Sequence, residues 1–152
     1  IGSGLVGSEM CIRDSVYTSH ERAGIINDLL AGIKPYIKED DCLFAYGSIP
    51  AINYMTRTRP FIGCSWPELL SAPLLKQKLN NYKGPLPAIL RQKFDSIGKE
   101  FGTPDENYLI DCGVEAGTFK SNKKSQVVNE FIEKNNYKIV FENQYFILFL
   151  PQ

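Results

Sequence analysis

The sequence lacks an excess of charge of either sign, and it lacks long hydrophobic runs. Its 152 residues carry 17 Lys and Arg against 17 Asp and Glu. A net charge of zero argues against a general nucleic-acid binder, because such proteins usually carry a basic excess. It also gives no reason to expect an anionic membrane surface as a partner. The longest apolar run, 145–150, is well short of the ~18 residues of a membrane span, and it predicts a buried strand.

Histidine is also scarce, and no common cofactor motif is present. His20 is the only histidine, so a Ser-His-Asp or Cys-His mechanism would have to use it. No serine lies in a G-x-S-x-G elbow, and neither G-x-G-x-x-G nor G-x-x-x-x-G-K-[ST] occurs. We therefore predict no cofactor. His20 as an exposed residue at a helix start is the alternative to a catalytic role.

Cysteine is too sparse and too widely spaced for a framework of disulfides or a zinc site. We predict no metal ion and expect buried thiols, while one disulfide beside a free thiol stays open. The four cysteines are Cys11, Cys42, Cys64 and Cys112.

The first 15 residues differ from the rest of the chain. They show no helical or strand period, and they have neither the basic start nor the apolar segment of a signal peptide. Their string GLVGSEMCIRDS resembles translated adaptor sequence at the ends of reading frames assembled from environmental data. We therefore expect residues 1–15 to be a non-native or disordered leader and the native chain to be truncated on its N-terminal side. An ordinary flexible terminus is the alternative. Without the leader, one basic and two acidic residues are lost, and the net charge becomes +1.

The remaining residues, 16–152, have the length and the 43% hydrophobic content of one folded domain. Apolar periodicity, capping boxes and turn residues predict alternating helices and strands. The predicted helices are 18–33 with a Thr18 cap, 51–55 with a Ser48 cap, a helix opening with the Ser65–Glu68 capping box and ending at 80–81, and one from Ser121 or Ser125 to 135–136. The predicted strands are 42–46, 61–64, 88–90, 137–141 and 145–150, with 101–124 mostly loop.

This order of elements predicts an α/β fold. Helices that alternate with short apolar strands are typical of a mostly parallel sheet with helices on both faces, which is a three-layer sandwich. The last two strands, 137–141 and 145–150, follow each other across a short polar turn and predict a C-terminal antiparallel hairpin at the edge.

Two turns that directly follow predicted strands provide the candidate binding site. Ligands of open α/β sheets bind at the carboxyl ends of strands, and tryptophan offers a stacking surface for a sugar ring. If both turns share one edge of the sheet, their side chains line a single crevice. The alternative interpretation is structural: a tight turn, a core tryptophan and a capping glutamate. The candidate ligand-binding residues are Gly47, Ser48, Tyr54, Cys64, Trp66 and Glu68.

The long loop carries four acidic residues. Paired carboxylates serve glycoside hydrolysis, and clustered ones bind Ca²⁺. Their spacing fits no EF-hand loop, and a solvated acidic loop balanced by neighbouring lysines is the alternative. These residues are Asp105, Glu106, Asp111 and Glu115.

Several stretches carry a resemblance to a known family. They are the helix that ends Leu29-Leu30 and Tyr36-Ile37, the string FAYGSIPAINYMT at 44–56, Arg59-Pro60, SWPEL at 65–69, and the helix that leads into the Tyr-rich hairpin at 137–151. From about residue 19 to 151 the chain resembles the soluble C-terminal domain of bacterial membrane glycosyltransferases of the C-type. These are relatives of the dolichyl-phosphate-mannose protein mannosyltransferases.

The resemblance implies an extracytoplasmic domain at the periplasmic face of the inner membrane, as an accessory part of an enzyme that uses a lipid-phosphate-linked sugar. The family's catalytic acidic residues lie among its N-terminal membrane helices, so no catalytic residue is carried over to this chain. The implied partners are the missing transmembrane region and a glycan acceptor or lipid-linked sugar, and no nucleic acid. Two alternatives stay open: a free-standing α/β module that binds a glycan or small ligand, and a small hydrolase-like enzyme that uses His20 or the acidic loop.

Overall fold

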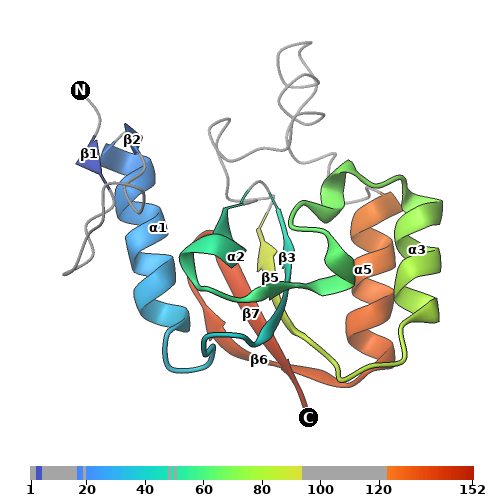
Figure 1. The fold of residues 1–152 in the computed structure, drawn as a ribbon. Coiled ribbons are helices and arrows are strands. Elements are labelled where there is room, and N and C mark those ends of the chain that lie inside the picture. Colours follow the sequence, from blue (N-terminus) through green and yellow to red (C-terminus); the bar gives the residue numbers. More distant parts are fainter. Residues whose placement is uncertain (1–2, 5–16, 19, 48, 50, 94–122) are drawn as a thin grey trace.

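The computed structural model describes residues 3–4, 17–18, 20–47, 49, 51–93 and 123–152, with side chains from Ala23 onward (Figure 1). The chain has the α/β content that its sequence predicts. Its helices are α1 (His20–Ile33), α2 (Ile52–Met55), α3 (Ala72–Asn81) and α5 (Lys123–Lys134). Its strands are β1 (Ser3–Gly4), β2 (Tyr17–Thr18), β3 (Cys42–Tyr46), β4 (Arg59–Pro60), β5 (Ala88–Gln92), β6 (Tyr137–Glu142) and β7 (Phe146–Pro151).

Five of these strands form one open sheet in the order β4-β3-β5-β7-β6. The strands β4, β3 and β5 are parallel, whereas β7 runs antiparallel to both β5 and β6. The predicted C-terminal hairpin is therefore confirmed. Its strand β7 lies beside β5 and leaves β6 as the edge. The strands β1 and β2 pair separately as a short antiparallel ribbon.

Alternate residues of the central strands face two different hydrophobic clusters, as the period of two in a strand requires. Leu43 and Ala45 of β3 pack in the cluster that includes Leu29 and Ile33 of α1. Their neighbours Phe44 and Tyr46 pack in the cluster that includes residues of α3 and α5. Accordingly, α1 covers one side of the sheet, and α3 and α5 lie together on the other (Figure 1).

Several predicted elements are confirmed closely. Strand 42–46 is β3, and α1 ends at Ile33, just before Pro35, which lacks the N–H that would continue the helix. The last helix, α5, buries Val127, Val128 and Phe131 as its periodicity predicts. It is followed by Asn136, whose φ of 52° is the left-handed conformation that asparagine tolerates.

The predicted strand 61–64 is wrong. The strand that pairs with β3 is Arg59–Pro60, and Phe61–Gly63 forms a 3₁₀ turn in which Ile62 has a φ of 52°. The apolar character of this segment reflects the burial of Phe61 against the sheet, and the segment itself is a turn and not an extended strand. A short apolar run fits either structure, and only the tertiary packing separates them.

Two predicted helix caps are also wrong. Pro67–Leu69 is a separate 3₁₀ turn that begins after Trp66 without a side-chain cap, so Ser65 and Glu68 form no capping box there. The helix begins later, at Ala72, where the Ser71 hydroxyl accepts the Leu74 N–H at 3.4 Å. The N-cap of α2 is Ala51 and not Ser48.

Thr18 belongs to β2, and α1 begins at His20, so the predicted Thr18 cap lies one residue before the N-cap position of the helix. Most of the leader and nearly all of the predicted loop 101–124, with its four acidic residues, lie outside the described residues. Within the part of the chain that the structure describes, no helix combines the length and the apolarity needed to cross a bilayer.

Candidate functional site

The turn after β3 lies at the carboxyl edge of the parallel strands, where the sequence predicts a site. Gly47 is buried there with a φ of 152°, a conformation that side chains rarely adopt. A Cβ at this position would lie 2.5 Å from both Cβ and Oε1 of Gln92, at the end of β5. Glycine therefore lets β3 and β5 approach closely at their carboxyl ends, while Ser48 lies outside the described residues.

The turn that contains Trp66 and Glu68 also contacts β3. Glu68 is only 5% exposed, and the indole N–H of Trp66 is buried although its side chain is half-buried overall. Cys64 is half-buried and carries a free thiol. Cys64 and Trp66 lie between the two 3₁₀ turns, and Glu68 lies within the second of them.

Tyr54 lies apart from that edge. Its helix, α2, runs back alongside β3, so that the side chain of Asn53 donates to Leu43 O at 3.2 Å, near the amino end of the strand. Tyr54 itself is 60% exposed. The structure therefore places Tyr54 beside the strand and away from the turn at Gly47.

The beginning of α5 adds polar groups that the sequence did not single out. Lys124 Nζ donates to Glu68 O at 2.6 Å, and the hydroxyl of Ser125 is fully buried. Arg91, at the end of β5, donates to Asn129 Oδ1 on the same helix. The sequence of a helix does not show which strand end its polar residues will contact. The lysines and the serine at the start of the predicted helix are the only local signal for this group of polar residues.

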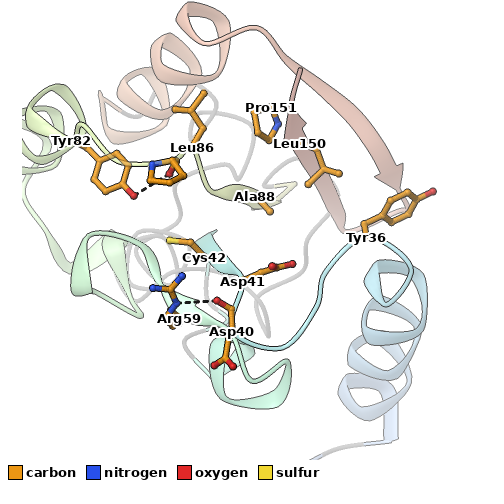
Figure 2. Close-up of a pocket in the computed structure, with 11 residues that line it drawn as sticks. Tyr36, Asp40, Asp41, Cys42, Arg59, Tyr82, Leu86, Ala88, Leu150 and Pro151 are labelled. Carbon is orange, nitrogen blue, oxygen red and sulfur yellow. Dashed lines mark hydrogen bonds between the residues drawn. The ribbon is translucent and has the colours of Figure 1, made fainter.

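A cavity of about 480 Å³ lies at the opposite, amino edge of the sheet, and we call it the amino-edge cavity (Figure 2). Cys42 and Ala88, the first residues of β3 and β5, lie at its centre, and Leu150 and Pro151 come from the end of β7. Its lining residues are Tyr36, Asp40, Asp41, Cys42, Arg59, Tyr82, Pro85, Leu86, Ala88, Leu150 and Pro151. This edge could not be found from the sequence, because it is built from the first residues of strands, which carry no turn motif.

Arg59 and Cys42 are two of the ionisable residues that line this cavity. Arg59 Nε donates to Asp40 O at 2.9 Å, and within the described part of the chain Arg59 forms no salt bridge. Burial raises the pKa of the Cys42 thiol, while the nearby Arg59 lowers it by a smaller amount. The thiol is therefore protonated at neutral pH and is a weak nucleophile.

Tyr137 lies behind the same edge and gives a test by pH. Its hydroxyl donates to Pro87 O at 2.9 Å, and burial, followed by the proximity of Cys42 and Tyr82, raises the pKa of its phenol. Because the folded-state pKa is raised, the protonated Tyr137 phenol stabilises the folded protein. This contribution to the unfolding free energy is complete below the unfolded-state pKa of about 10 and is lost as the pH rises beyond it.

We expect Tyr137→Phe to lower the unfolding free energy at neutral pH by about 1 kcal/mol, through loss of the hydrogen bond. Above pH 10, however, its stability should fall less steeply than that of the wild type. Urea unfolding of both proteins at a series of alkaline pH values measures the two slopes. Equal slopes would contradict the raised pKa.

The candidate catalytic side chains, His20 and the four acidic residues of the predicted loop, lie outside the part of the chain whose side chains the structure describes. His20 begins α1, but its side chain is not among those described, and Asp105, Glu106, Asp111 and Glu115 lie outside the described residues. In the described ranges no three His, Cys, Asp or Glu side chains gather in a way that could hold a metal ion.

Comparison with known proteins finds no match for this chain among protein-family models, curated proteins or solved structures.

Proposed function

We propose that this chain is the extracytoplasmic accessory domain of a polytopic membrane glycosyltransferase that uses a lipid-phosphate-linked sugar, and that it is not catalytic alone. The observation that carries the proposal concerns two of the stretches that resemble this family, 44–56 and 65–69. The first stretch contains residues 44–46 of the central strand β3. The 3₁₀ turn in the second contacts the same strand, although eight residues separate the two stretches. A resemblance in two separate stretches has more weight when they build one part of the fold.

The individual residues in these stretches have structural tasks. Gly47 allows the close approach to Gln92. Asn53 is buried and donates to both Leu43 O and Thr58 Oγ1, at 3.2 and 3.1 Å, which holds α2 against β3 and the start of β4. These structural roles support the proposal, because in the proposed family the motifs of this domain shape the fold and the catalytic groups lie elsewhere in the enzyme.

The proposal also covers the layer architecture of the domain and the edge that it turns toward the transmembrane region. We propose a three-layer sandwich, supported by the separate clusters on the two sides of the sheet. The helix α1 begins at the carboxyl edge of β3, so we propose that the transmembrane region precedes it there. Two exposed leucines at this edge, Leu69 at 66% and Leu74 at 40%, support contact of this edge with that region.

Two experiments test this proposal. The first is recovery of the upstream sequence from the same genome, which should encode a series of apolar segments of about 20 residues each. A native start codon directly before the domain, with no such segments, would refute the membrane assignment.

The second experiment determines on which side of the membrane the domain lies. In the full-length protein with its cysteines replaced by serine, a single Lys83→Cys, at an exposed position after α3, is treated with a membrane-impermeant maleimide. We expect labelling in intact spheroplasts. The matched control is a cysteine in a cytoplasmic loop, which should react only after permeabilisation. Labelling of Lys83→Cys only after permeabilisation would place the domain in the cytoplasm and refute the proposal.

A further inference from the structure

The polar wall of the amino-edge cavity presents one charge of each sign. The carboxylate of Asp41 points toward the space between Ala88 and Tyr36, whereas that of Asp40 points away from the cavity (Figure 2). Asp40 contributes its backbone carbonyl instead, which accepts the Nε–H of Arg59. One oxygen of Asp41, Oδ2, accepts the Lys38 N–H at 2.8 Å, and this leaves Oδ1 for a ligand.

The opposite wall is apolar. Leu86, Leu150 and Pro151 lie across the cavity from Asp41 and Arg59, and Tyr36 and Tyr82 stand at its two ends (Figure 2). Two of these side chains are exposed to solvent, Tyr36 at 41% and Leu86 at 36%. The hydroxyl of Tyr82 donates its hydrogen to Pro85 O at 3.0 Å, so toward a ligand it can act only as an acceptor.

These two walls select a ligand by chemistry. An anion would pair with Arg59 but would be repelled by Asp41, and a cation would meet the reverse. A wholly apolar ligand would cover both charged groups without satisfying their hydrogen bonds, which is costly. A hydroxyl group both donates and accepts, so it can serve the carboxylate and the guanidinium alike.

We propose that the amino-edge cavity binds a neutral polyhydroxylated ring of the pyranose type. Its hydroxyls would bond to Asp41 Oδ1 and to the terminal nitrogens of Arg59, and its C–H face would lie against Leu86, Leu150 and the tyrosine rings. The cavity's volume of about 480 Å³ falls in the range of about 300–1,000 Å³ that is usual for ligand sites. This proposal does not depend on the membrane assignment, since it concerns the opposite edge of the sheet.

The test is a titration of the ¹⁵N-labelled 152-residue chain with methyl α-D-mannopyranoside, methyl β-D-glucopyranoside and N-acetylglucosamine, followed by NMR. We expect at least one of them to shift the amide signals of Asp41, Cys42, Arg59 and Ala88 in a saturable way. In parallel, the same sugar should slow alkylation of Cys42 by iodoacetamide, while Cys64, outside the cavity, keeps its rate.

Two pairs of variants make the test specific. Asp41→Asn, Arg59→Ala and Tyr36→Ala should each weaken binding roughly tenfold, the effect of losing one charged hydrogen bond or one stacking face. Tyr54→Ala, an exposed tyrosine outside the cavity, is the matched control for Tyr36→Ala. Arg57→Ala matches Arg59→Ala, since Arg57 pairs with Glu39 on the surface at 3.0 Å. Both controls should bind as the wild type does.

Other outcomes would overturn the inference. If no sugar shifts these signals, if inorganic phosphate or glycine shifts them and the sugars do not, or if Tyr36→Ala and Arg59→Ala bind as tightly as Tyr54→Ala and Arg57→Ala, the cavity does not recognise a neutral ring. None of these results would bear on the side of the membrane or on the upstream sequence, so failure here is distinguishable from failure of the proposed function.

Discussion

Gly47→Ala is expected to destabilise the protein by about 3 kcal/mol, because it combines an unfavourable φ with overpacking. The φ of 152° is strained for alanine, and the new Cβ would lie 2.5 Å from Gln92 Cβ, which belongs to the strand's own framework and cannot swing away. Gln92 is fully buried, so the collision cannot be relieved into solvent. Either β3 and β5 must separate at their carboxyl ends, or the turn must change shape.

Urea unfolding, followed by circular dichroism, measures this effect. The matched control is Gly63→Ala, because Gly63 also has a positive φ, 66°, but nothing lies within 4 Å of its added Cβ. We expect the control to lose only about 1 kcal/mol, the conformational part of the cost. Equal losses for the two variants would show that the close approach to Gln92 contributes nothing.

The largest loss of stability is expected for Phe61→Ala, about 3–5 kcal/mol, the usual cost of removing a buried phenylalanine side chain. Phe61 is 1% exposed, and its ring lies 5.5 Å from that of Phe44, 4.4 Å from Tyr82 and 6.1 Å from Phe131, measured between centroids. It thereby joins β3, the end of α3, and α5. Its removal would leave a cavity that three elements cannot easily close.

If Phe61→Ala does not fold, Phe61→Leu gives a measurable and smaller loss in the same unfolding experiment. Tyr54→Ala is the control, because it removes an aromatic ring that is 60% exposed, and we expect it to change stability by less than about 0.5 kcal/mol. A loss for Phe61→Leu no greater than that of Tyr54→Ala would contradict the placement of Phe61 in the core.

The elements with a clear local signal were predictable. Strand 42–46 shows in the sequence as an unbroken apolar run, Pro35 marks the end of α1, and the 3.6-residue period places the buried face of α5 correctly. The hairpin of β6 and β7 follows from two apolar runs across a polar turn. In each case the local pattern and the tertiary packing require the same conformation.

The region from 59 to 71 was not predictable in the same way. Phe61 packs as a core residue although its segment turns, and Ser65 begins no helix because the chain first forms a separate 3₁₀ turn at Pro67–Leu69. Short apolar runs and capping boxes describe a few residues at a time. Which of their conformations is adopted depends on the sheet and on α5, which come from distant parts of the sequence.

For the candidate site, the sequence by itself determined that a turn at Gly47 follows strand 42–46, because an unbroken apolar run ends there at a glycine. Trp66 and Glu68 instead follow a 3₁₀ turn and not the predicted strand 61–64. Only the tertiary structure decided that Tyr54 lies away from them and that the first residues of β3 and β5 come together with the end of β7 around a cavity. The physical reason is that strand pairing joins residues far apart in the chain, and no local pattern encodes which strand lies next to which.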